Sequence, residues 1–281
     1  GGEGFDGALK RVCGSNGVGV CCYVLKYYDC PLHILIFNTS ILTTMPKPFL
    51  TAQWRKIILA NYAVDPEILK PYLPAHTELD YWNDTCYVSI VGFLFDAVKV
   101  KGFKIPNHHS FPEVNLRFYV RYKDGEEWKR GVVFIKEIVP KTMVTFIANT
   151  IYKEKYHTLP MRHQWDLVDN EQRVEYEWKV NNKWNFIRVK AGIEPIDIKV
   201  GSEAEFITEH YWGYTKLSDT KTSAYEVVHP RWKVYRMHNL NFSFSTKELF
   251  GEAFVPYLET KPTSIFLAEG SEVQVLGGGK I

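Results

Sequence analysis

The strongest constraint on the fold is a strict alternation of apolar and polar side chains over residues 114–122, VNLRFYVRY. Successive side chains of a β-strand point to opposite faces, so one face of this strand is apolar and the other is polar. The turn-forming sequence KDGEE follows, and then a second apolar run, GVVFIKEIV. We therefore predict a β-hairpin over residues 113–139. Its apolar face carries Val114, Leu116, Phe118 and Val120, and its polar face carries Glu113, Asn115, Arg117, Tyr119 and Arg121.

Further strands surround this hairpin. Residues 86–95 are a nearly continuous apolar run, and residues 173–192 alternate around Asn181-Asn182, which predicts a second hairpin. Two more apolar segments, residues 225–237 and 264–276, add strands. With turns as short as these, we expect the pairing to be mostly antiparallel.

Helix signals are few and short. Asp65 followed by Pro66 predicts a short helix that stops at Pro74. Ser202 with Glu205 forms a capping box for a helix that extends to about His210. The apolar spacing within residues 140–152 also predicts a helix, which makes the stretch from Tyr156 to His163 the loop after it. Strands separated by few helices, with no repeat or linker over residues 45–275, favour one α+β domain with a large curved or closed antiparallel sheet.

The first 44 residues differ from the rest. They hold four of the five cysteines, Cys13, Cys21, Cys22 and Cys30, and none of the eight tryptophans. Their apolar run is interrupted at residues 26–29, so it matches neither a secretory signal nor a membrane span. We expect residues 1–44 to be a non-native or disordered extension, and residues 45–281 to form the domain. A single remaining cysteine, Cys86, indicates a reducing compartment, so we expect a cytoplasmic protein.

Charge and motifs exclude several function classes. The formal net charge of +2 is too balanced for a nucleic-acid-binding surface or a polybasic membrane anchor. The glycine-rich nucleotide motifs, the zinc-protease motif and the serine-hydrolase elbow are missing from the sequence. The histidine spacing does not favour a metal site over isolated surface or pocket histidines. We expect no metal, no cofactor, no nucleic acid and no membrane partner; a homo-oligomer is left open.

The polar face of the 113–139 hairpin permits two interpretations. It is either a solvated stripe or the lining of an interior site, where Arg117 with Glu113 would bind an anion or a carbonyl group. If the apolar face packs under outer helices, the pleat sends Asn115, Arg117 and Tyr119 inward. A buried Arg117 then needs a carboxylate partner, either Glu113 or a bound anion.

Three runs carry a family resemblance: FLTAQWRKIILANYAVDPEILKPYLPAHTELDYWNDTCYVSIVGFLF, FPEVNLRFYVRY and GVVFIKEIVPKTMVTFIANTIYKEKYHTLPM. They resemble the uncharacterised YqjF-like family over about residues 45–275. That family is similar to the acetoacetate decarboxylases, whose fold is a cone-like antiparallel β-barrel with an interior site. The resemblance implies an acetoacetate-decarboxylase-like barrel with a few short helices, and it implies the fold more strongly than the reaction.

The resemblance also suggests site residues. Arg55 stands where the decarboxylases have a site arginine, and Glu113 corresponds to a site glutamate. The decarboxylases end their loop with Pro-Lys-Lys, in which the first lysine forms a Schiff base. Here Pro160 is followed by Met161 and Arg162, neither of which forms an imine, and Lys153 and Lys155 are weak substitutes. Classical decarboxylase activity is therefore not expected.

Two functional hypotheses rest on one set of candidate residues. The candidate catalytic residues are Glu113 and His157, and the candidate substrate-binding residues are Arg55, Asn115, Arg117, Tyr119, Tyr156, Met161, Arg162 and His163. The first hypothesis is an acetoacetate-decarboxylase-like barrel that binds a small anionic or carbonyl-containing organic molecule in its interior, positioned by Arg55, Arg117 and Glu113, with a reaction on that molecule left open. The alternative is a binding or sensing module without chemistry. A third interpretation, a scaffold with a solvated polar stripe, requires Arg117 to be exposed.

Overall fold

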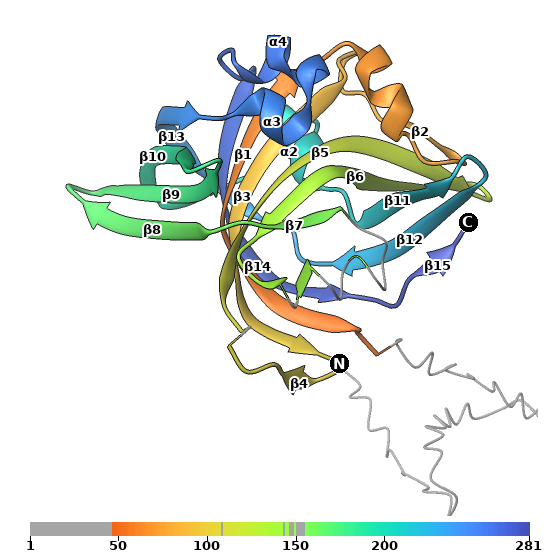
Figure 1. Cartoon of the computed structure of the whole chain (residues 1–281), viewed down its shortest axis with the longest axis horizontal. Helices are drawn as coiled ribbons and strands as arrows, with labels where there is room; N and C mark the ends of the chain where they lie inside the picture. The colour runs from red at the N-terminus through yellow and green to blue at the C-terminus, as the bar shows by residue number, and fades with distance from the viewer. Residues whose placement is uncertain (1–46, 108, 143, 146–148, 150–154) are drawn as a thin grey trace, which may run out of the picture. The chain divides into compact units, whose positions relative to one another are not determined.

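One hydrogen-bonded path of strands organises the fold (Figure 1). The computed structural model describes residues 47–281 except 108, 143, 146–148 and 150–154. Its strands are β1 (Leu50–Ala63), β2 (Thr77–Leu79), β3 (Tyr87–Val100), β4 (Phe103–Lys104), β5 (Phe111–Asp124), β6 (Glu127–Val139), β7 (Tyr156–Thr158), β8 (Met161–Val168), β9 (Glu171–Val180), β10 (Lys183–Asp197), β11 (Trp212–Ser218), β12 (Lys221–Val228), β13 (Lys233–Ser243), β14 (Ser264–Val275) and β15 (Gly279–Lys280). Its short helices are η1 (Pro66–Tyr72), α2 (Glu203–Thr208), α3 (Thr246–Phe250), η2 (Glu252–Phe254) and α4 (Val255–Leu258).

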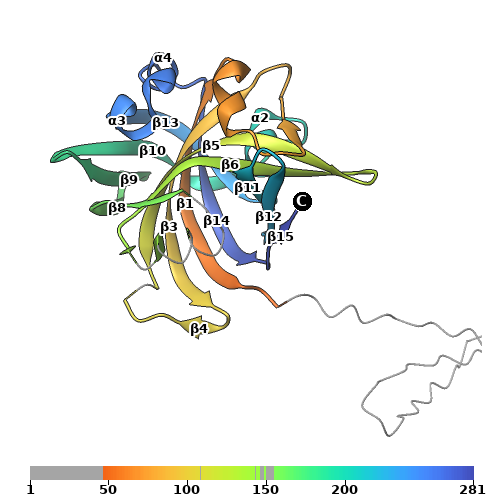
Figure 2. The same cartoon turned by 45° about the vertical axis from the view of Figure 1, so that its right-hand side comes forward.

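The strand order is β15-β12-β11-β6-β5-β3-β1-β14-β13-β10-β9-β8. Pairing is antiparallel except between β11 and β6 and between β6 and β7. β12 also pairs with β14, so the path from β12 through β5 to β14 returns to its first strand. Strands β8, β9 and β10 form an arm that projects from this ring (Figures 1 and 2). The expectation of a mostly antiparallel sheet with few short helices is confirmed.

Most of the predicted elements are present. The 113–139 hairpin is β5–β6, and the 173–192 hairpin is β9–β10. Asn181 and Asn182 both have positive φ, as a two-residue hairpin turn requires. Asp65 caps η1, where its Oδ1 accepts from the Glu67 N–H at 2.9 Å, and Ser202 caps α2. Each cap accepts a hydrogen bond from a backbone N–H in the first turn of its helix, where these groups have no partner within the helix.

Three expectations needed correction or fall partly outside the described residues. Residues 156–163 are not one loop, because Tyr156–Thr158 pair with β6 as strand β7 and the residues from Met161 onward pair with β9 as strand β8. The predicted strand 225–237 is two strands, since Pro230 has no N–H to donate to a ladder and the chain breaks between β12 and β13. The helix expected within residues 140–152 is described only at residues 142, 144, 145 and 149, which are helical. The expectation for residues 1–44 lies outside the described residues.

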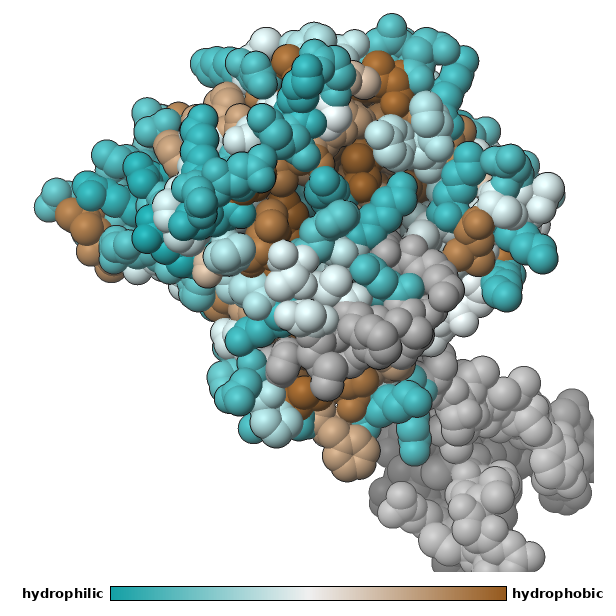
Figure 3. All heavy atoms as spheres, in the orientation of Figure 1, coloured by the Kyte–Doolittle hydropathy of each residue, from teal (hydrophilic) through white to brown (hydrophobic). Residues whose placement is uncertain are grey.

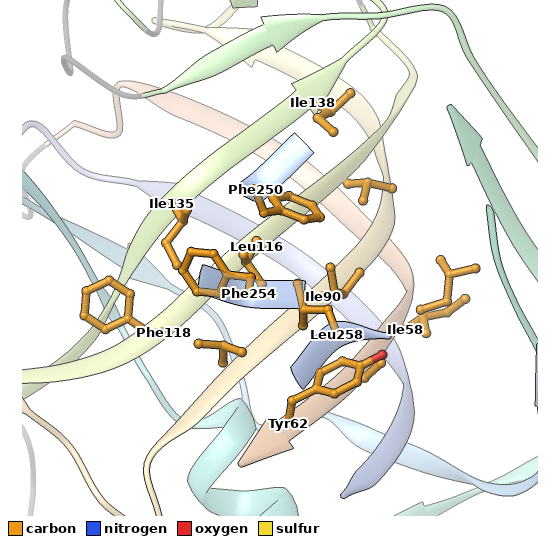
Figure 4. Packing of buried hydrophobic residues seen from close by; sticks show 14 of the residues in the cluster. Ile58, Tyr62, Ile90, Leu116, Phe118, Ile135, Ile138, Phe250, Phe254 and Leu258 are labelled. Atoms are coloured by element: carbon orange, nitrogen blue, oxygen red, sulfur yellow. The ribbon is translucent and has the colours of Figure 1, made fainter. Parts of the chain in front are cut away.

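Both faces of the sheet are buried, each against different elements. The apolar face of β5 joins one core with the side chains of the terminal helices α3, η2 and α4 (Figure 4). In that core Leu116 and Phe118 pack with Phe250, Phe254 and Leu258, and every one of these side chains is at most 5% exposed. The other face of the sheet lies against a second core that includes Val91, Phe93, Phe206 and Trp232. The predicted alternation in β5 therefore separates an outer core from an inner one.

A glycine fixes the inner-face geometry of β1. Gly270 in β14 pairs with Arg55, has φ +82°, and a Cβ placed on it would lie 2.0 Å from the carbonyl oxygen of Trp54. We expect Gly270→Ala to lower the free energy of unfolding by at least about 3 kcal/mol, since it adds a steric clash to left-handed strain. Gly102→Ala, with φ +85° but open space around it, should cost only about 1–2 kcal/mol. Equal losses for the two variants in urea titrations would contradict this.

None of the helices in the described part of the chain has the length and apolar character needed to cross a membrane.

Candidate functional site

The inner face of the sheet lines a cavity of ≈ 150 Å³. Its wall is mostly aromatic and aliphatic, with side chains from β1, β3, β5, β6, β12 and the segment around Trp232. Trp54 lies 5.2 Å from Phe93 and 6.2 Å from Trp232 between ring centroids, and His229 stacks on Trp232 at 4.3 Å. A small number of polar groups interrupts this apolar wall. They include Glu113, Asn115, Arg117, Glu137, Tyr156 and His210.

Glu113, Asn115 and Tyr156 form one hydrogen-bonded group. Asn115 Nδ2 donates to Glu113 Oε1 at 2.9 Å, and the Tyr156 hydroxyl donates to Glu113 Oε2 at 3.0 Å. The Asn149 side chain binds the backbone of Tyr156: the Tyr156 N–H donates to Asn149 Oδ1 at 2.9 Å, and Asn149 Nδ2 donates to the Tyr156 carbonyl at 3.0 Å. Glu113 and Asn115 are each only 2% exposed. The group therefore sets a carboxylate rigidly in the cavity wall.

A second buried glutamate, Glu137, lines the same cavity and is 1% exposed. A strict alternation does not predict the inward position of Glu137, because a β-bulge shifts the β5–β6 register between Leu116 and Arg117. On β6, Val132 and Phe134 face the cavity before the bulge, and Glu137 faces it after the bulge. Lys136 is paired with Leu116, whose side chain is on the outer face. A strict period of two would have placed Lys136 inside. The local sequence feature that could have pointed to Glu137 is its position as a carboxylate within the apolar run GVVFIKEIV.

Arg117 contributes a cation to the cavity wall. Its Nη2 donates to the Ile207 carbonyl at 3.4 Å, and its guanidinium lies 5.6 Å from the centre of the Tyr119 ring. The Nε atom is buried without a hydrogen-bond partner among the described residues. The partner expected for Arg117 was either a carboxylate or a bound anion, and the same cavity wall holds two buried glutamates, Glu113 and Glu137.

Tyr119 is part of a hydrogen-bonded chain that links four strands beside the cavity. Its hydroxyl lies 2.6 Å from Ser89 Oγ, which donates to Asn61 Oδ1 at 2.6 Å, and Asn61 Nδ2 donates to Ser264 Oγ at 3.0 Å. The chain of hydrogen bonds links β5, β3, β1 and β14. Tyr119 shares the inner face with Arg117 but is not part of the cavity wall.

His210 lines the cavity and was not among the predicted site residues. It follows α2, and its Nε2 lies 3.2 Å from Asp80 Oδ2, which also accepts from Arg130 Nε at 2.6 Å. Burial lowers the pKa of His210 to about 4, although Asp80 acts in the opposite direction. Burial alone would raise the pKa of Asp80, but hydrogen bonds from His210 and Arg130 lower it. The pair is thus a carboxylate and a neutral imidazole near pH 7.

The tautomer of His210 follows from this pairing. An ionised carboxylate accepts only, so Nε2 carries the proton and Nδ1 keeps its lone pair. Nδ1 is buried without a hydrogen-bond partner among the described residues. His210 is part of the cavity wall, whereas Asp80 is not. No sequence pattern marks this pair, since Asp80 and His210 are 130 residues apart.

Besides Tyr119, five predicted site residues lie away from the cavity wall. Arg55 forms an ion pair with Glu269 at 2.6 Å, in a cluster with Lys56 and Tyr235. His157 lies near Lys136; burial and then that lysine lower the pKa of His157. The remaining three are on β8. Met161, Arg162 and His163 pair along β9, where Arg162 forms an ion pair with Glu177.

Of the ten predicted residues, four line the cavity: Glu113, Asn115, Arg117 and Tyr156. Within the described residues, no three His, Cys, Asp or Glu side chains gather in an arrangement that could hold a metal ion.

The family model described as an uncharacterized conserved protein, DUF2071, matches residues 51–272. The chain belongs to the DUF2071 family. A curated relative, the uncharacterized protein YqjF of Bacillus subtilis (strain 168), is 26% identical over 184 residues, which cover 64% of this chain and 72% of that protein. The resemblance inferred from the sequence runs is therefore confirmed.

Solved structures share the fold of this DUF2071 member. The enduracididine biosynthesis enzyme MppR complexed with pyruvate has a TM-score of 0.59 at 13% identity, covering 87% of this chain and 93% of that one. Acetoacetate decarboxylase from Legionella pneumophila has a TM-score of 0.55 at 12% identity, covering 91% and 98%. At these identities the comparison establishes an acetoacetate-decarboxylase-like fold and nothing about activity.

Proposed function

We propose that this protein is a closed β-barrel that binds a small organic acid in its interior cavity, with the acid's carboxylate on Arg117. The observation that carries the proposal is the buried Arg117 Nε, which has no hydrogen-bond partner among the described residues. Arg117 as a whole is half-buried, but a buried donor without a hydrogen-bond partner is costly. A carboxylate is the anion that a guanidinium binds best, because its two oxygens match the planar fork of donors.

The other polar atoms of the cavity wall narrow the ligand class. Trp54 Nε1 is a further buried donor, and Asn115 Oδ1 and His210 Nδ1 are buried acceptors, all without a hydrogen-bond partner among the described residues. Buried polar groups are normally paired, so these atoms indicate what the ligand offers. The donors suit a carboxylate or carbonyl oxygen, and the acceptors suit a hydroxyl. The ligand is thus a carboxylic acid with a carbonyl or hydroxyl group.

Cavity volume limits the ligand's size. An apolar protein cavity of about 150 Å³ holds benzene, so a cavity of ≈ 150 Å³ accommodates roughly six to eight non-hydrogen atoms. The structural neighbours are consistent with this class, since one is described in complex with pyruvate and another is an acetoacetate decarboxylase. Four- to five-carbon oxo and hydroxy acids fit both limits.

A panel titration tests the proposal. Oxo and hydroxy acids of three to six carbons, and the neutral amide of each, would be titrated against the protein in thermal-shift measurements. We expect saturable stabilisation by at least one acid and at least about tenfold weaker binding of its amide, because only the acid supplies an anion for Arg117. A panel without a saturable response, or an amide that binds as well as its acid, would contradict the proposal.

A binding module without chemistry is the second candidate, and one observation favours it. The described residues of the cavity wall include no lysine, and Lys155 places its Nζ 5.0 Å from the Tyr72 ring, outside that wall. We expect borohydride reduction in the presence of acetoacetate to leave the protein mass unchanged. An adduct mapped by mass spectrometry to Lys153 or Lys155 would show a displaced Schiff-base lysine and would support the enzyme.

A further inference from the structure

Strand β8 is an exposed edge of the sheet. It ends the hydrogen-bonded path, and in the described part of the chain its strand partner is β9 alone. Residues 162–167 are all exposed, and Trp165 and Leu167 keep 36% and 70% of their surface. Figure 3 shows hydrophobic side chains among hydrophilic ones on the projecting arm. A long exposed edge strand is a template for pairing with another strand.

The backbone of β8 has an alternation that fixes how such pairing would occur. The Lys179 N–H donates to the Pro160 carbonyl at 2.9 Å, which directs the backbone groups of the even-numbered residues of β8 toward β9. In an antiparallel ladder the N–H and C=O of one residue point to the same side, and successive residues alternate. The groups of residues 161, 163, 165 and 167 therefore point away from β9, toward the exposed edge.

We propose that two copies of this chain associate by antiparallel pairing of β8 with β8 of the second copy, about a twofold axis at Gln164. This register pairs odd residues with odd residues, so the outward backbone groups meet. It places Arg162 opposite Asp166 of the second copy, and Met161 opposite its Leu167. His163 faces its Trp165. The twofold axis repeats each pair, as in an interface that uses the same patch on both copies.

Charge complementarity selects this register. Within one copy Arg162 forms an ion pair with Glu177, and Asp166 pairs across the strands with Arg173. The proposed contact extends these pairs into a row of alternating sign across the dimer: Glu177, Arg162, then Asp166 and Arg173 of the second copy. A register centred at His163 or at Trp165 instead places Arg162 opposite Gln164 or Val168 and removes both cross-copy pairs.

The other face of β8 supplies the apolar part of the contact. Trp165 and Leu167 lie on the same side as Met161 and His163, the side that faces the cross-strand neighbours Val174, Tyr176 and Trp178 in the outer core. Pairing brings the second copy's apolar side chains beside the exposed Trp165 and Leu167. The contact is one strand wide, so we expect a dimer that dissociates on dilution.

Sedimentation equilibrium of the full chain tests the dimer with two charge variants. The average molar mass of the wild type should rise with protein concentration and approach twice the chain mass of 32.6 kDa. Asp166→Arg and Arg162→Asp each place like charges opposite each other twice, so each alone should raise the dimer dissociation constant at least about tenfold. A mixture of the two variants restores both opposite-charge pairs, and we expect it to form a heterodimer with near-wild-type affinity.

The control is Asp219→Arg, the same charge change in the exposed turn between β11 and β12, where the side chain is 94% exposed. It should leave the dimer unchanged. Each β8 variant also places like charges opposite each other within its own copy, against Glu177 or Arg173, so its free energy of unfolding should fall by about 1 kcal/mol or less while the fold is retained. A wild type that stays monomeric, a variant dimer that persists, or a mixture that stays monomeric would overturn the proposal.

Discussion

Arg117→Met is expected to weaken the binding of a stabilising organic acid by at least about 30-fold, close to 2 kcal/mol. Methionine keeps much of the side-chain volume but removes the cation that faces the cavity. The fold should be retained, and the melting temperature without ligand should stay the same or rise, because the variant removes a buried Nε that has no hydrogen-bond partner among the described residues. Thermal-shift titrations with the best acid of the panel measure both effects.

Arg121→Met provides the matched control for this experiment. Arg121 is on the same strand, but it forms an ion pair with Glu78 near the strand end and its side chain is 40% exposed. Exposed pairs contribute about 0–1 kcal/mol to stability, and this one does not contact the cavity. Binding should therefore be unchanged in Arg121→Met. Indistinguishable titrations for wild type and Arg117→Met would show that the acid binds elsewhere.

The second large effect is an acid-dependent loss of stability through His210. The pKa of this histidine is about 4 in the folded protein and about 6.5 when exposed in the unfolded chain. Between these values the unfolded chain binds a proton that the folded protein does not, so lowering the pH favours unfolding. The free energy of unfolding should fall by on the order of 3 kcal/mol from pH 6.5 to pH 4, and this contribution should be complete above pH 6.5.

Two measurements check this contribution. NMR titration of the imidazole should give a pKa about two units or more below that of an exposed histidine, because burial and the neighbouring Arg130 and Arg117 oppose the charged form more than Asp80 favours it. Urea titrations between pH 4 and pH 7 should show a smaller slope in His210→Phe than in the wild type. His229 is also buried with a lowered pKa, so part of the slope should remain. A His210 that titrates near pH 6.5 would refute the argument.

The sequence by itself determined the local alternation and the elements built on it. A period of two is a property of each strand's own backbone, so the faces of β5 and the turn at Asn181-Asn182 could be predicted without knowing what packs against them. For the same reason the inward positions of Asn115 and Arg117 followed from the outward ones of Leu116 and Phe118. Helix caps at Asp65 and Ser202 are equally local.

The tertiary structure decided which strands face the cavity and where the alternation changes phase. The bulge in β6 brings Glu137 inside, and the positive φ of Lys56 accompanies a shift in β1 that leaves Trp54 on the cavity and Arg55 paired with Glu269. The Asp80–His210 pair joins segments far apart in sequence. Residues 161–168 form strand β8 by hydrogen bonding to β9. Bulges and long-range pairs depend on the packing of distant segments, which no short stretch of sequence encodes.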